Sequence, residues 1–207
     1  MADLVTIAGL ATAGGTLVLA VATFGATRSA NRAARVAERS LLIGLRPTLM
    51  PSRPEDPPVD VDFAAGARMV RVPPGGAVVV VEQDHALLAI ALRNVGAGLA
   101  VLRGWHAQPG HRSAGRQHTD PDEFRPLMRD LYAAAGDTGF WQGAIRDPAD
   151  PLLPELREAI AQGEPVSVEV LYADQEGGQR LITRFTLRPR DDGPWLATAG
   201  RHWTLDV

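Results

Sequence analysis

Residues 166–187, VSVEVLYADQEGGQRLITRFTL, have the pattern of a β-hairpin. Two runs rich in β-branched and aliphatic residues, 166–172 and 180–187, flank the turn sequence Gln175-Glu176-Gly177-Gly178. A glycine-containing turn between two such runs favours antiparallel pairing. The same composition recurs at 59–63, 67–72, 78–82, 87–94 and 99–107, and in two short runs, 195–198 and 202–205, that we expect to pair around Gly200.

These short strands predict a mainly β domain over residues 59–207. Their hairpin turns favour an antiparallel, immunoglobulin-like β-sandwich, and a small barrel is the alternative. Helical patterns interrupt the strands. Asp120-Pro121-Asp122-Glu123 is typical of a helix start that Gly136 would end, and 151–162 repeats the pattern before Gly163. We therefore expect a helical insertion over about 109–163.

The N-terminal segment has the length of a membrane span. No charged residue lies between Asp3 and Arg28. As a helix, residues 4–27 would extend about 36 Å, more than the ~30 Å of a hydrocarbon core. The sequence predicts that residues 1–27 form one transmembrane anchor. The alternatives are a buried core helix, or a signal peptide cleaved near Ala22 that would release an exported domain.

A basic helix is expected directly after the anchor, over residues 28–45. Its positive charges follow the uncharged run instead of preceding it, which by the positive-inside rule places the N-terminus outside and the C-terminal domain in the cytoplasm. Their spacing of four, three and four residues puts them on one helical face, where anionic lipid headgroups would bind them. The alternative is a topology signal on a solvated helix. These residues are Arg28, Arg32, Arg35 and Arg39.

Two further features belong to this N-terminal part. Small residues recur four apart at Gly9/Ala13 and Ala11/Gly15, a spacing that lets membrane helices approach and would allow a homo-oligomer. Gly44 and Pro47 should end the helix, and the Pro-rich residues 46–58 are expected as a stiff linker or an edge strand at the start of the domain.

The segments ALRNVGAGLAVLRGW (91–105) and EVLYADQEGGQRLITRFTL (169–187) carry a resemblance to a family. They are similar to a pattern in bacterial single-pass membrane proteins that have an anchor, an Arg-Pro linker and an immunoglobulin-like sandwich. The resemblance covers the anchor and about half of the domain. It implies a fold and a location and brings no catalytic residues.

Composition excludes several kinds of chemistry. The chain has no cysteine, so disulfides, thiol catalysis and thiolate metal sites are absent. A formal net charge of −3 provides no global positive field for nucleic acid. GxSxG, HExxH and a Gly-rich phosphate loop are also missing. We expect no enzyme activity and no cofactor.

One region keeps an enzymatic alternative open. Histidines and acids gather between residues 106 and 123, which would suit a metal-assisted hydrolase if they converged. Their spacing matches no zinc template, so solvated loop histidines are the favoured interpretation and no metal site is predicted. The residues are His106, His111, His118, Asp120, Asp122 and Glu123.

The sequence as a whole favours a membrane-tethered, non-enzymatic adaptor that holds a cytoplasmic protein partner at the inner face of the membrane. Long insertions often carry function, so the partner surface is expected on the 109–163 insertion. Its large aromatic side chains are the candidate contact residues: Phe124, Tyr132, Phe140 and Trp141.

Overall fold

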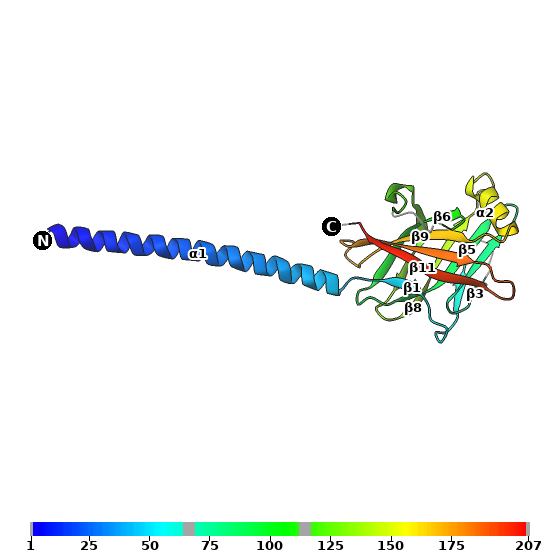
Figure 1. Ribbon diagram of the computed structural model, residues 1–207, viewed down its shortest axis with the longest axis horizontal. Helices are drawn as coiled ribbons and strands as arrows, with labels where there is room; N and C mark the ends of the chain where they lie inside the picture. The colour runs from blue at the N-terminus through cyan, green and yellow to red at the C-terminus, as the bar shows by residue number, and fades with distance from the viewer. Residues whose placement is uncertain (1, 64–68, 112–116, 206–207) are drawn as a thin grey trace. The chain divides into compact units, whose positions relative to one another are not determined.

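The computed structural model describes residues 2–63, 69–111 and 117–205, without the side chains of 2–8, 10–13 and 18. The chain divides into two compact units, Met1–Gly44 and Leu45–Val207. The first consists of helix α1, Ala2–Gly44, which runs without interruption (Figure 1). This confirms that the N-terminal helix continues through the basic segment and ends at Gly44.

The described part of α1 is exposed along its length. Two threonines within the uncharged run bond back to the helix itself: Thr23 Oγ1 donates to Leu19 O at 2.8 Å and Thr27 Oγ1 to Thr23 O at 2.8 Å. Such bonds satisfy the hydroxyls without solvent. Among the side chains that the structure describes, no helix combines the length and the apolarity needed to cross a membrane.

The second unit is built on a nine-stranded sheet in the order β1-β5-β4-β11-β10-β9-β6-β7, and the ninth strand, β8, also pairs with β5. Its pairings are antiparallel, so the mainly β, antiparallel prediction is confirmed. The strands are β1 (Leu49–Pro51), β4 (Gly76–Val81), β5 (Ala86–Asn94), β6 (Ala100–Pro109), β7 (Arg125–Ala133), β8 (Thr138–Ile145), β9 (Val166–Ala173), β10 (Arg180–Arg188) and β11 (Trp195–Thr204).

The sheet curls until its end strands, β7 and β8, come back into contact. A single curled sheet corresponds more nearly to the barrel alternative than to two separate sheets (Figure 1). Alternate side chains of the strands fill its interior, and the largest of those that are fully buried are Trp141, Tyr172 and Phe185. A small hairpin of β2 (Val59–Asp62) and β3 (Met69–Val72) forms a second sheet.

Strand β5 is buried on both faces, which explains its continuous apolar sequence. Leu88, Ile90 and Leu92 face the main core. Leu87 and Ala89 face the opposite way, into a second core under the β2–β3 hairpin. The hairpin therefore covers the outer face of β5, as a helix or a second sheet does in other folds.

The predicted helical insertion at 109–163 is wrong for its first half. The capping pattern at Asp120 produces only a short 3₁₀ helix, η1 (Pro121–Glu123), in which the Asp120 carboxylate accepts from Asp122 N–H at 3.1 Å. Strands β7 and β8 follow and belong to the main sheet. Pro126 would break a longer helix, and extended backbone puts Leu131 and Ala133 in the core while Tyr132 faces out. The second predicted helix is confirmed as α2, Leu152–Ala161.

Two boundaries also differ from the prediction. The segment 46–58 contains strand β1, which pairs with β5 through Leu49↔Asn94, so its edge-strand alternative is confirmed and the domain begins before residue 59. The two short strands predicted around Gly200 form one strand, β11. Arg201 and Ala199 pair with neighbouring residues of β10, and Gly200 is a bulge between these two pairs. Of the predicted strand at 67–72, residues 69–72 form β3, and 67–68 lie outside the described residues.

The buried Asn94 side chain joins three segments where the domain begins. Its Oδ1 accepts from Thr48 N–H and Gly96 N–H, each at 3.0 Å. Its Nδ2 donates to Gly98 O at 2.6 Å and to Ala133 O at 3.0 Å. Four bonds are the full capacity of an asparagine side chain.

The two glycines of this turn allow the close approach. A Cβ at Gly96 would collide with the Arg46 carbonyl oxygen, and one at Gly98 with that of Leu45. Glycine is therefore needed where the backbone of residues 45–47 crosses the turn after β5.

Candidate functional site

The candidate site is the gap between the two end strands of the curled sheet, which we call the β7–β8 seam. Strand β7 pairs with β6, and β8 with β5; the structure gives no ladder between β7 and β8 in its described part. The strands are close beside their connecting turn, where a Cβ at Gly139 would lie 3.4 Å from Ala133 Cβ. Farther from the turn they separate around a cavity of about 180 Å³.

A bulge in β7 holds the seam open. Leu131 pairs with Leu102 and Pro126 with Gly104, so residues 127–130 lie opposite Arg103 alone. A bulge of this size bends the strand away from a regular ladder. Pro126 also has no N–H to donate to a neighbouring strand. Met128, within the bulge, is 81% exposed.

Two tryptophans form the base of the seam. Trp105 and Trp141 meet edge to face with their ring centroids 5.6 Å apart. Gly143 leaves room for them, since a Cβ there would lie 2.8 Å from Trp141 Cζ2 and 3.0 Å from Trp105 Cε2. Trp105 and Gly143 line the cavity, and the buried Trp141 Nε1 has no partner among the described residues.

Arg125 has a neutralising partner at one end of the cavity. It forms a two-point ion pair with Asp150, in which Nη2 donates to Oδ1 at 2.9 Å. Its guanidinium also lies 5.5 Å from the Trp105 ring centroid. The hydrogen bonds from Arg125 hold the pKa of the Asp150 carboxyl below its ordinary value. The charge of Arg125 is therefore compensated within the domain.

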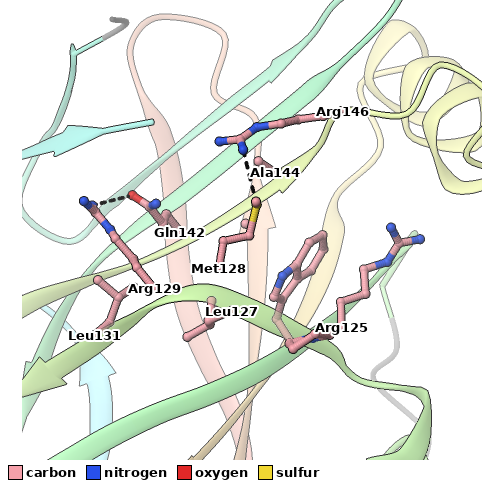
Figure 2. A pocket seen from close by; sticks show the side chains of 11 residues that line it. Arg125, Leu127, Met128, Arg129, Leu131, Gln142, Ala144 and Arg146 are labelled. Atoms are coloured by element: carbon pink, nitrogen blue, oxygen red, sulfur yellow. Dashed lines mark hydrogen bonds between the residues drawn. The ribbon is translucent and has the colours of Figure 1, made fainter. Parts of the chain in front are cut away.

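Arg129 and Arg146 bridge the seam in opposite directions (Figure 2). Arg129, on β7, donates to Gln142 Oε1 on β8 at 2.9 Å, and its guanidinium lies 5.5 Å from the Phe140 ring. Arg146, just after β8, reaches Met128 Sδ on β7 at 3.2 Å. These partners are neutral, and neither arginine makes an ion pair with any described residue. The seam therefore presents two uncompensated cations.

Three of the four predicted contact residues reach the surface, although none of the three lines the seam cavity. Tyr132 is 55% exposed, Phe140 is half-buried beneath Arg129, and Phe124 is half-buried with its ring centroid 6.2 Å from that of His106. Trp141 is wrong as a contact residue, because it is fully buried in the main core. The sequence predicts none of Arg129, Arg146 and Met128 as contact residues: Met128 and Arg129 lie in 120–136, whose pattern indicates a helix, and no local pattern marks Arg146.

The histidines and acids between residues 106 and 123 do not converge. His106 Nδ1 lies 3.4 Å from Thr119 Oγ1, His118 Nδ1 lies 2.7 Å from Thr119 O, and His111 Nδ1 lies 3.5 Å from Thr186 Oγ1. Within the described ranges, none of them joins a group of three ligands able to hold one metal ion. Asp122 and Glu123 belong to η1, which Asp120 caps. The geometry gives the hydrolase alternative no support.

A buried ion pair lies away from the seam, between β9 and β10. Glu169 accepts from Arg184 Nε at 2.7 Å and from Thr119 N–H at 2.8 Å. Arg184 also donates to Gln117 O at 2.7 Å and lies 4.8 Å from the Trp203 ring centroid. Burial alone would raise the pKa of Glu169, but these hydrogen bonds outweigh it and lower the pKa. The pair ties the 117–119 segment to the sheet.

Comparison with other proteins assigns no family. No family model matches the chain, and no curated protein matches it either. Among solved structures, the chain is similar to a protein from Archaeoglobus fulgidus known from its crystal structure, at 16% identity and a TM-score of 0.25. That similarity covers 63% of this chain and 94% of the other.

Proposed function

We propose that this chain is a membrane-tethered binding domain, in which α1 anchors the β domain and the β7–β8 seam holds a protein partner at the inner face of the membrane. The observation that carries the tether is the uncharged run 4–27 at the start of one unbroken helix. Apolar side chains in it, such as Leu19 and Phe24, are 68% and 69% exposed. An exposed helical run without charged side chains is stabilised by an apolar environment, and a bilayer supplies one.

The charge after the run supports the orientation. Arg28, Arg32 and Arg35 are exposed, and beside Phe24 and Asn31 they line one shallow groove of the helix. Anionic headgroups would attract each cation near the surface by about 1 kcal/mol. The same charges favour retention of this side in the cytoplasm. The β domain would then face the cytoplasm.

Charged substitutions within the run are expected to release the protein from membranes. A Leu17→Arg/Val21→Arg variant places two cations where each costs about 2.5–3.5 kcal/mol in a bilayer. The unaltered chain should stay with membranes after alkaline carbonate washing and dissolve only in detergent, whereas the variant should move to the soluble fraction.

Val36→Arg is the matched control, because Val36 is equally exposed but lies in the basic segment. It should remain in the membrane fraction. Recovery of the unaltered chain in the soluble fraction without detergent would contradict the tether. A mature N-terminus beginning after Ala22 would indicate an exported domain instead.

A photo-crosslinking residue at Met128 is expected to capture the partner in intact membranes. Met128 lies in the seam and is 81% exposed, so the probe would face whatever occupies the seam. The same probe at Met69, which is 67% exposed on β3, is the control. A discrete adduct from position 128 alone, detected by gel shift, would support the seam. Identical adducts from both positions, or none from 128, would contradict it.

A further inference from the structure

We propose that the β7–β8 seam binds an extended, acidic peptide segment of the partner protein. The inference rests on the proposed function and names the chemistry that its binding site recognises. Three properties of the seam lead to it: free strand edges, uncompensated cations and an apolar recess between them.

The strand edges favour an extended ligand. Among the described strands, β7 pairs only with β6 and β8 only with β5, so the edges that face each other across the seam have no ladder partner. Unpaired strand edges present backbone N–H and C=O groups that a peptide in extended conformation can pair with. The bulge at 127–130 keeps β7 from closing onto β8 and so leaves these groups accessible.

The charges favour an acidic ligand. Arg129 on β7 and Arg146 just after β8 extend across the same opening from its two sides (Figure 2). Their present partners, Gln142 Oε1 and Met128 Sδ, are neutral and weaker acceptors than a carboxylate. Arg125 differs from these two arginines, because its carboxylate partner, Asp150, already belongs to the domain. An Asp or Glu side chain of the peptide would form with Arg129 or Arg146 the kind of ion pair that Arg125 already forms with Asp150.

The cavity favours an apolar side chain between the acidic ones. Trp105, Leu127 and Leu131 contribute apolar surface to its lining. Successive side chains of an extended peptide point to opposite sides, so one apolar residue can enter the recess while carboxylates meet the arginines at its rim. A lipid headgroup would satisfy the cations but would make no use of the strand edges or the recess.

The test uses a fluorescein-labelled peptide of alternating Glu and Leu that has the same length as β7. Its binding to the full chain in mild detergent is measured by fluorescence anisotropy. The same peptide with Gln in place of Glu is the ligand control. We expect the Glu peptide to bind, the Gln peptide to bind at least about tenfold more weakly, and added salt to weaken the Glu peptide.

Variants locate the binding. Arg129→Gln/Arg146→Gln should weaken the Glu peptide about tenfold or more, since charge-assisted hydrogen bonds are lost. Met128→Glu should also weaken binding of the Glu peptide, because the new carboxylate would form an ion pair with Arg146 in place of the peptide. Arg190→Gln removes an exposed charge from a loop elsewhere and should leave affinity within about twofold. All four changed positions are exposed, so thermal unfolding should be unaltered.

Several outcomes would overturn the inference. They include equal binding of the Glu and Gln peptides, and an Arg190→Gln effect as large as that of the seam variants. A Met128 crosslink to a partner without peptide binding would keep the seam as a partner surface and reject an acidic peptide.

A lipid-binding test uses fragment 45–207, which contains both hydrophobic cores and should fold alone. If the fragment sediments with phosphatidylserine vesicles, and Arg129→Gln/Arg146→Gln abolishes that binding, the seam recognises membrane instead.

Discussion

Arg184→Met is expected to lower the free energy of unfolding by about 3–5 kcal/mol, the cost of removing one partner from a buried ion pair. Arg184 and Glu169 are 3% and 2% exposed, so the carboxylate left behind could not be solvated. The variant would also lose the bond to Gln117 O and the contact with the Trp203 ring. Denaturant unfolding followed by tryptophan fluorescence measures the change.

Two further variants separate the pair from general effects of substitution. Arg184→Met/Glu169→Leu should recover part of the loss, because no uncompensated charge remains buried. Arg190→Met is the matched control at an exposed position and should change stability by no more than about 0.5 kcal/mol. A loss of under about 1 kcal/mol in Arg184→Met would show that the pair is not a buried, coupled unit.

The same pair sets the direction of a pH dependence. The folded state lowers the pKa of Glu169, so the unfolded chain binds more protons in acid and protonation favours unfolding. The stabilisation is present above the ordinary glutamate pKa of about 4.3 and is lost as the pH falls through the lowered pKa of the folded state. The stability difference between the unaltered chain and Arg184→Met should therefore shrink in acid.

Asn94→Ala is expected to destabilise the β domain by about 3 kcal/mol or more. The substitution removes four hydrogen bonds at a fully buried position and leaves two backbone N–H groups and two carbonyls without that partner. A buried polar group left unsatisfied costs about 1–3 kcal/mol. Chemical denaturation measures the loss, and hydrogen exchange should rise first at Thr48 and Gly96.

Asn94→Asp tests whether the amide itself matters. Its oxygens can still accept from Thr48 and Gly96, but a carboxylate has no donor for the carbonyls of Gly98 and Ala133. It should be as damaging as alanine near neutral pH. Asn31→Ala, on exposed α1, is the control and should leave the β domain unchanged. An Asn94→Asp protein as stable as the unaltered chain would contradict this role.

Local patterns predicted the elements whose backbone follows from their own residues. The alternating runs and the glycine turn at 175–178 identified the β9–β10 hairpin, in which Gly177 has a φ of 75°. The apolar periodicity of 151–162 identified α2, which buries Leu153, Leu156 and Ala159. Gly44 marked the end of α1. Each of these signals acts over a few residues, so no distant contact is needed to interpret it.

Residues 120–136 show why the candidate site could not be predicted. Their capping pattern indicates a helix, yet Leu131 and Ala133 are held in extended backbone by pairing with Leu102 and Ala100 on β6. That pairing joins segments separated by some thirty positions and buries alternate side chains in the main core. Once the segment is a strand, Arg129 and Met128 belong to an open edge instead of a helix surface.

The chain's own sequence determined the mainly β domain, the uncharged run with its trailing arginines, and the absence of cysteine chemistry. Only the tertiary structure decided that Trp141 is core, that Asn94 and Glu169 are buried, and that Arg129 and Arg146 line one cavity between β7 and β8. The reason is that periodicity and turn chemistry act between near neighbours in sequence. Burial and charge compensation depend on which distant strands the closing sheet brings together.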